Sequence, residues 1–450
     1  MDRTTGEALV RMIEDVFLRF ELSISNLRGQ TYDGASNMSG SYRGCQAIIS
    51  DKQPLALYVH CGAHCVNLVA QSAAAECNDI MAAMSWLQEL GKFFGSSIKF
   101  RQLFAQVAAS DSEGPYSAIK PLCPTRWLMR TPAINSVVKQ YAAVLESLEE
   151  AKLVQKDTRA ASLVASSQKG STLLLLQIAL VVFGPLELLN KSLQSSSASV
   201  SQMLEAVKTV KQEILSSRTD ESFHCLFTAT VQSAAELDLE PIVVPRQRKP
   251  PKRFTGTAVA HQHTSAEEYY RAIHYSFIDA AVQQLDDRFD CEKTGLHKYC
   301  KLQNIILTGV VDHDVTASYP ELNAVSASLD IELRMFRHQY KYISATEAIQ
   351  IMRSLQPAVQ DLFPVLKEYM KLLLVNPASS ATAERSFNSL RRLKTWLRNS
   401  MGQTRLNSCA VCSVHVEALD ETDIRRLAED FISRAHSREN LFGKFRPTAC

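Results

Sequence analysis

The middle of the chain, residues 123–355, carries long helical patterns and almost no alternation of apolar and polar residues of the kind that strands need. The apolar side chains repeat at helical spacing over residues 131–153, 171–193, 199–217 and 265–289. Residues 238–264 contain four prolines interleaved with basic residues, so this stretch cannot be a helix and predicts an exposed loop. The middle therefore predicts a large all-helical domain.

The residues before this middle part show a different pattern. They predict, in order, strand, helix, strand and helix at residues 24–33, 35–49, 55–61 and 63–75. That order at this spacing is typical of an α/β layer. The predicted fold class is α/β with a large all-α insertion, predominantly helical overall. The predicted domains are residues 1–122, 123–355 and 356–450.

Length and charge limit the class of protein. The 450 residues exceed what a single core usually holds. Lys and Arg number 49 and Asp and Glu 47, a net charge of +2, so contact with DNA needs a local basic patch. The longest apolar runs are interrupted by Gln177 or stopped by Gly184-Pro185, so we expect no membrane helix. Eleven scattered cysteines predict a reduced, intracellular protein.

Two carboxylates are candidate metal ligands. Asp33 directly follows the first predicted strand, where a carboxylate can hold a divalent ion. The alternative is that Asp33 begins a turn or caps the next helix. Glu384 lies near the start of a predicted helix, where it can reach a metal or simply interact with the positive end of the helix dipole.

Two groups of cysteine and histidine have the appearance of zinc sites. His60-Cys61-Gly62-Ala63-His64-Cys65 crowds four ligand-type residues into one strand-to-helix junction, whereas structural zinc usually joins two separated pairs. Cys409, Cys412 and His415 lie within an apolar helical pattern. Buried structural residues are the favoured interpretation of both groups; a zinc-binding module is the alternative for the first.

Basic residues provide three candidate nucleic-acid contacts. Arg126-Trp127 pairs a cation with an aromatic ring that can stack on a base, although a buried tryptophan that anchors a helix is commoner. Arg391 and Arg392 follow the first turns of the predicted helix that carries Glu384, where they could contact phosphates. Residues 245–253 form a basic run, which is typical of a solvated linker or a nuclear import signal.

These motifs, taken in order, resemble the hAT transposase family. The matching motifs are Asp-Gly-Ala-Ser-Asn-Met (33–38), Cys-x-x-His (61–64), Cys-Pro-Thr-Arg-Trp (123–127) and Asn-Pro-Ala-Ser-Ser-Ala-Thr-Ala-Glu-Arg-Ser-Phe (376–387). Within the family, the chain resembles transposase-derived chains related to zinc finger MYM-type protein 1. The resemblance extends to about residue 418. It implies an incomplete ribonuclease-H-like core at residues 1–122, a helical insertion at residues 123–355 and a C-terminal hAT dimerisation region at residues 356–450 that returns to complete the core.

The resemblance also implies roles for single residues. In the family, three carboxylates hold two Mg²⁺ ions for DNA strand transfer. By resemblance, Asp33 is the second carboxylate and Glu384 the third. Cys61 and His64 match the Cys-x-x-His signature, and Trp127 matches the aromatic that stacks on a flipped base. In the family, the first carboxylate lies upstream of the part that matches this chain. The resemblance therefore implies that the chain is N-terminally truncated. The two remaining carboxylates would hold Mg²⁺ only weakly.

We therefore expect a transposase-derived protein that is catalytically inactive and needs no cofactor and no small-molecule substrate. By resemblance it is nuclear, or otherwise cytoplasmic. It is expected to form a homodimer through Leu373, Leu374, Phe387, Leu390 and Trp396. Weak non-specific DNA binding is expected through Arg126, Trp127, Arg391 and Arg392. The alternative is a residual DNA nuclease or strand transferase in which Asp33 and Glu384 hold Mg²⁺.

Overall fold

The computed structural model describes residues 4–111, 118–119, 130–153, 158–195, 198–245, 264–292, 294–323, 325–395, 400–415 and 424–443. It divides into two compact units, Met1–Ser380 and Ala381–Cys450. The domain borders predicted at residues 122 and 355 stay predictions.

A small parallel sheet lies in the first unit. Among the described residues it has two strands, β1 (Gly29–Tyr32) and β2 (Leu57–His60). Gly29 pairs with Leu57 and Tyr32 with His60, so both strands end at the same edge. The strands predicted at 24–33 and 55–61 contain these two, and the short helix η1 (Ile24–Asn26) precedes β1.

The helix predicted at residues 35–49 is broken in the structure. It forms α2 (Ser36–Ser39) and α3 (Cys45–Lys52), which together make the crossover that a parallel pair requires. Gly40 and Gly44 cause the break. A Cβ on Gly44 would lie 2.4 Å from the backbone nitrogen and oxygen of Gly40, so only glycine allows this turn to close.

The first helix, α1 (Gly6–Arg19), packs on α3. Thr5 caps it, since its hydroxyl oxygen accepts the Ala8 amide hydrogen at 3.4 Å. The side chain of Val10 is 2% exposed and forms a small apolar cluster with Cys45, Ile49 and Ala56. This cluster packs α1 against α3 and the residue before β2.

The rest of the first unit is helical, so the prediction of a predominantly helical chain with a small α/β part is confirmed. The helices are α4 (Gly62–Glu76), α5 (Asn78–Ser96), α6 (Ile98–Asp111), α7 (Arg130–Lys139), α8 (Tyr141–Leu153), α9 (Thr158–Ser167), α10 (Gly170–Leu193), α11 (Val200–Ser216), α12 (Asp220–Glu236), α13 (Ala266–Phe289), α14 (His297–Thr308), α15 (His313–Ala317), α16 (Pro320–Asn323), α17 (Ser326–Gln339), α18 (Ala345–Ser354), α19 (Pro357–Gln360) and α20 (Pro364–Val375).

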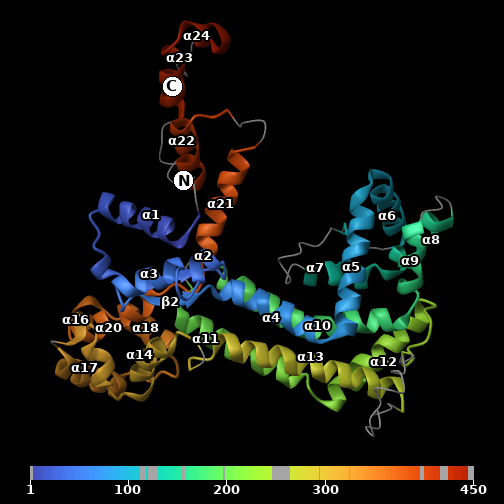
Figure 1. The fold of residues 1–450 in the computed structure, drawn as a ribbon, viewed down its shortest axis with the longest axis horizontal. Coiled ribbons are helices and arrows are strands. Elements are labelled where there is room, and N and C mark those ends of the chain that lie inside the picture. Colours follow the sequence, from blue (N-terminus) through green and yellow to red (C-terminus); the bar gives the residue numbers. More distant parts are fainter. Residues whose placement is uncertain are drawn as a thin grey trace. The chain divides into compact units, whose positions relative to one another are not determined.

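Helix α10 is the centre of the first unit. It contacts α4, α5, α7, α11, α12 and α13, and Figure 1 shows it beside α4. Apolar residues occur all round it, as expected for a helix surrounded by other helices. The helical pattern predicted at residues 171–193 is confirmed, since α10 continues through Gly184 and Pro185 to Leu193. Burial of Leu186, Leu189 and Leu193, roughly 1.5–3 kcal/mol each, outweighs the roughly 3 kcal/mol that a proline costs inside a helix.

Helix α10 is long and apolar enough to span a membrane, although the sequence analysis expected no helix of this kind. In its most apolar window, however, 61% of the residues are buried inside the protein. Buried core helices have the same composition, and the contacts of α10 are those of such a helix.

Cys291 and Cys300 form a disulfide in the structure, whereas the sequence analysis expected reduced cysteines. The turn between α13 and α14 brings their Cα atoms to 6.2 Å, a distance that a disulfide can span. Seven further described cysteines are free thiols: Cys45, Cys61, Cys65, Cys77, Cys225, Cys409 and Cys412.

The second unit contains α21 (Ala381–Leu393), α22 (Gln403–Val414), α23 (Ile424–Ser433) and α24 (His436–Phe442). Helix α21 packs on α22, and α23 packs on α24. Few of their apolar side chains are buried; Leu406 and Ile432 are each 7% exposed.

The central role of α10 leads to a test with two leucines of the same helix. Leu186 is fully buried and Leu188 is 67% exposed. We expect Leu186→Ala to lower the free energy of unfolding by about 2–5 kcal/mol, because it leaves a cavity in the core. Leu188→Ala should change it by no more than about 0.5 kcal/mol. Urea unfolding followed by circular dichroism measures both, and equal effects would contradict this position of α10.

Candidate functional site

Three of the sequence motifs meet where the two strands end. We call this region the sheet-end junction and define it as Asp33, Gly34, His60, Cys61, Gly62, His64 and Asn376–Ser380. Asp33 follows β1, His60 is the last residue of β2, and Cys61 precedes α4. The carboxyl ends of parallel strands commonly form ligand sites, so this edge is the first place to look for chemistry.

The segment Asn376–Ser380 returns to the junction from more than 300 residues away in the sequence. The Thr31 hydroxyl donates a hydrogen bond to the Pro377 carbonyl oxygen at 2.8 Å. The Gly62 amide donates to the Ala378 carbonyl oxygen at 2.8 Å, and the Ser380 amide donates to Cys61 Sγ at 3.3 Å. The Ala378 amide donates in turn to the Ala198 carbonyl oxygen at 3.1 Å.

Gly62 is required by the close approach of this returning segment. A Cβ at position 62 would lie 3.1 Å from the Ala378 carbonyl oxygen and 2.5 Å from Met203 Sδ. The glycine inside Cys-Gly-Ala-His therefore lets the start of α4 pack against the returning backbone.

Two imidazole rings face Gly34 at the junction. The ring centroids of His60 and His64 are 5.5 Å apart. A Cβ on Gly34 would lie 3.2 Å from Nε2 of His60 and 3.1 Å from Nε2 of His64. His60 Nε2 is buried and has no hydrogen-bond partner in the described part of the chain. Burial, together with His64, lowers the pKa of His60, while Asp33 acts in the opposite direction. His60 is therefore neutral at neutral pH.

Asp33 has the geometry of a turn residue. Its Oδ1 accepts the Ala35 amide hydrogen at 3.2 Å, as in the alternative raised by the sequence. Glu384 lies exposed on α21 in the second unit. In the described residues, no group of three or more His, Cys, Asp or Glu side chains is arranged to hold a metal ion.

The cysteines of the junction fit a structural role better than a zinc site. Cys61 and Cys65 are 0% and 2% exposed. Burial, reinforced by Cys61, raises the pKa of Cys65 to about 12, so its thiol is protonated in the metal-free chain. On α22, Cys409 is half-buried, while Cys412 and the following His415 are exposed, so the prediction that these small residues are buried was wrong for Cys412. The second unit buries too little of α22 to cover them.

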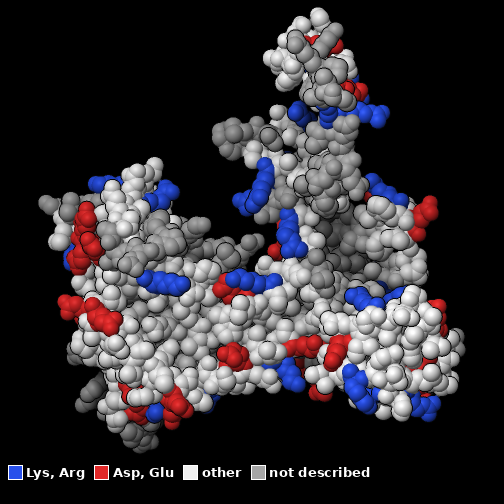
Figure 2. Space-filling model, turned by 180° about the vertical axis from the view of Figure 1, so that it is seen from behind, with Lys and Arg blue, Asp and Glu red and all other residues white. Residues whose placement is uncertain are grey.

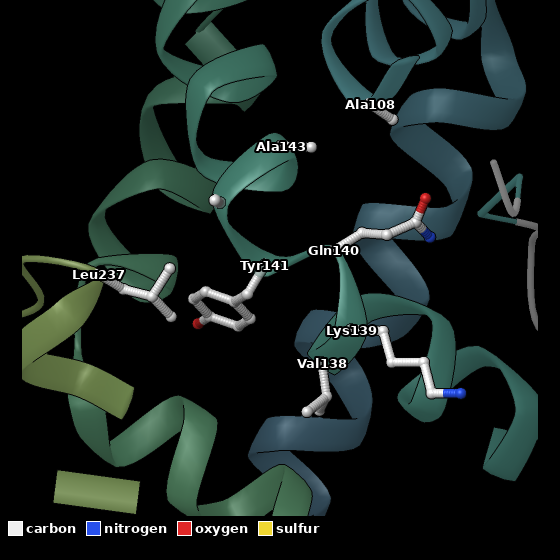
Figure 3. A pocket seen from close by; sticks show the side chains of 8 residues that line it. Ala108, Val138, Lys139, Gln140, Tyr141, Ala143 and Leu237 are labelled. Carbon is white, nitrogen blue, oxygen red and sulfur yellow. The ribbon is translucent and has the colours of Figure 1, made fainter. Parts of the chain in front are cut away.

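A small cavity lies in another part of the first unit, where α7 meets α8 (Figure 3). Its volume is about 140 Å³, and its lining includes Ala108, Val138, Tyr141 and Leu237. Small-molecule sites usually have about 300–1,000 Å³. The Tyr141 hydroxyl already donates to the Ser167 carbonyl oxygen at 2.9 Å, so neither this hydroxyl nor the small volume favours a ligand site.

The residues predicted for the dimer surface differ in burial. Leu373, on α20, is fully buried in the core of the first unit and cannot meet a partner subunit there, so its assignment to the dimer surface is corrected. Leu373 is buried because neighbouring helices surround α20. The spacing of leucines in the sequence does not show this. Leu374 and Leu390 are half-buried, Phe387 is 70% exposed, and Trp396 lies outside the described residues.

The predicted nucleic-acid contacts are described only in part. Arg391 and Arg392 are exposed near the end of α21. Arg126, Trp127 and residues 246–253 of the basic run lie outside the described residues. On the face that Figure 2 shows, acidic and basic side chains are interspersed without a continuous field of one sign, in keeping with the small net charge.

Comparison with known proteins identifies the class. Residues 1–44 match the family described as ZMYM1/FAM200, RNase-like domain, and residues 332–417 match the hAT family C-terminal dimerisation region. The chain is thus hAT-derived and carries a dimerisation region of that family, as the sequence motifs predicted. The presence of this region indicates self-association.

Two curated proteins show distant similarity over most of the chain. Both carry the name 52 kDa repressor of the inhibitor of the protein kinase. The human protein is 21% identical over 460 aligned residues, which cover 94% of this chain and 57% of the relative. The mouse protein is 21% identical over 436 residues, which cover 90% and 55%. The chain therefore spans a little over half the length of these relatives.

The lowered pKa of His60 predicts how the stability of the first unit depends on pH. An unfolded histidine takes up a proton near pH 6.5, whereas folded His60 resists protonation. The neutral His60 side chain therefore makes its full contribution to the free energy of unfolding above about pH 6.5. The free energy of unfolding falls as the pH drops below that value, because the unfolded chain takes up a proton that the folded chain resists. His274, which burial shifts in the same direction, adds to this loss.

The measurement is urea unfolding between pH 7.5 and 5. We expect His60→Gln to flatten the curve, because glutamine takes up no proton in either state. His313→Gln, at an exposed position, is the control and should keep the wild-type slope. An unchanged slope in His60→Gln would show that folded His60 titrates as it does in the unfolded chain.

Proposed function

We propose that this chain is a non-catalytic, self-associating protein of hAT origin that forms homodimers through its C-terminal region and binds DNA weakly without sequence preference. The observation that carries the proposal is the match of residues 332–417 to the hAT dimerisation region. The activity and partners of the whole protein are part of this proposal, because the chain spans only 57% and 55% of the two relatives.

The exposed apolar side chains of the second unit support homodimer formation. More than half of each of these side chains is exposed: Phe387, Val411, Leu427, Phe431, Leu441 and Phe442. Single exposed apolar residues are ordinary, but their concentration in a region of about sixty residues is typical of a surface that a partner covers. Phe387 is the strongest candidate, since aromatic residues are enriched at the centre of interfaces.

The state of Asp33 supports the absence of strand transfer. Its Oδ1 accepts the Ala35 amide hydrogen in a turn, and burial keeps the nearby His60 neutral. The name of the two relatives describes a repressor, with which a non-catalytic role is in keeping. The alternative function remains a metal-dependent DNA nuclease or strand transferase that uses Asp33 and Glu384 with Mg²⁺.

DNA binding and nuclear location complete the proposal. The exposed Arg391 and Arg392 can contact phosphates, an interaction without sequence information. The nuclear location rests on the basic run at residues 245–253. A fluorescent fusion of the chain that stays outside the nucleus would contradict this location.

Dimer formation is tested by size-exclusion chromatography with light scattering. We expect the wild-type chain to have twice the mass of one chain at micromolar concentration. Phe387→Asp should raise the dissociation constant of the dimer at least tenfold, about 1.4 kcal/mol, because it places a charge in an apolar contact. Tyr42→Asp is the control, since Tyr42 is 91% exposed and lies far outside the matched region. A clean monomer of the wild-type chain would refute homodimer formation.

DNA binding and catalysis are tested on one labelled duplex. Affinity should fall steeply with salt, and Arg391→Ala/Arg392→Ala should reduce the slope of log K against log salt by about 2, since two phosphate contacts are lost. The control is Arg353→Ala, an exposed arginine of α18. No cleavage above background is expected in Mg²⁺ or Mn²⁺. Cleavage that Asp33→Asn abolishes would establish the alternative nuclease instead.

A further inference from the structure

A groove lies on the first unit between α17 and α19. Its volume is about 490 Å³, and it is lined by Arg334, Met335, His338, Gln339, Tyr340, Val359, Leu362 and Phe363. The floor is rigid, because Phe363 is 4% exposed and packs edge-to-face on the buried Phe336 with their centroids 5.5 Å apart. A rigid floor of this kind binds without first having to become ordered.

The rim of the groove exposes apolar side chains to solvent. Leu362 is 58% exposed and Met335 is 47% exposed. Ile331, one helical turn before Met335 on α17, is 50% exposed, so the two side chains form a ridge beside the groove. A ridge next to a groove is a surface that can be complementary to a second copy of itself.

The charges around the groove also fit contact with a second copy. Arg334 provides a positive charge, and the exposed Asp330 and Asp361 provide negative charges. Within the part of the chain that the structure describes, none of these three side chains is in an ion pair. A two-fold contact places a patch against its own copy, so the patch must carry both signs if it is not to repel itself.

The position of the groove in the sequence identifies the occupant. All of its lining residues, from Arg334 to Phe363, lie within the region 332–417 that matches the hAT dimerisation region. We propose that a second copy of this chain docks on this groove, with the ridge of Ile331 and Met335 of each copy against the groove of the other and Arg334 against an aspartate of the other. This inference rests on the proposed homodimer and assigns a surface to it.

The first experiment replaces a rim residue. Leu362→Asp should raise the dissociation constant of the full-length dimer at least tenfold, measured by analytical ultracentrifugation. Leu188→Asp is the matched control, since Leu188 has a similar exposure, 67%, and lies outside the matched region. It should dimerise like the wild type. Far-ultraviolet circular dichroism verifies that both variants are folded.

The second experiment uses charge exchange, which does not disturb the core. Arg334→Asp and the double variant Asp330→Arg/Asp361→Arg should each lose self-association by at least tenfold. Mixed together, the two variant chains should associate with each other, because the opposite charges are restored across the contact. Such rescue would not occur if the groove bound a different partner or a small molecule.

The outcomes separate this inference from the proposed function. A wild-type chain that is monomeric overturns the homodimer and the groove with it. A wild-type dimer that both Leu362→Asp and Arg334→Asp leave intact overturns the groove alone. If Leu362→Asp does not fold, the charge-exchange pair decides, and absence of rescue counts against the proposal.

Discussion

The hydrogen bonds that attach Asn376–Ser380 to the end of the sheet hold the first unit together. They join Pro377, Ala378 and Ser380 to residues near position 30 and near position 60, so the whole helical excursion between these points is a closed loop. The entropic cost of closing a loop rises only slowly with its length, about 0.6 kcal/mol for each doubling. A large helical insertion is therefore compatible with the small sheet, provided that it buries apolar surface of its own.

That burial is supplied by α10 and its neighbours. One continuous apolar cluster runs from Leu57, in β2, through α10 to Ala378, in the returning segment. The sheet end and the helical excursion are thus not independent bodies, since they share a core. Only the smaller cluster around Val10 and Cys45, under α1, stands apart from it in the described residues.

The groups at the sheet-end junction are held in neutral or turn-forming states. Burial keeps His60 and Cys65 uncharged. The Oδ1 atom of Asp33 accepts a hydrogen bond from the Ala35 amide. Of these three, only Asp33 has an active-site role by resemblance, and in this structure its Oδ1 makes a turn contact. Exposed apolar side chains occur in the matched region 332–417, for example Leu362 and Phe387. They are in keeping with the self-association that the dimerisation region indicates.

The sequence by itself determined the strands, most of the helices, the position of Asp33 at a strand end and the family of the motifs, because apolar periodicity and turn residues act over a few neighbouring positions. It did not determine that Gly40 and Gly44 break a helix, or that Leu373 is fully buried. The resemblance implied that the C-terminal region returns to complete the core, but it did not determine the contacts of Asn376–Ser380 with Thr31, Cys61 and Gly62. These features depend on which distant segments surround a residue, and burial by distant neighbours is decided only when the chain has folded.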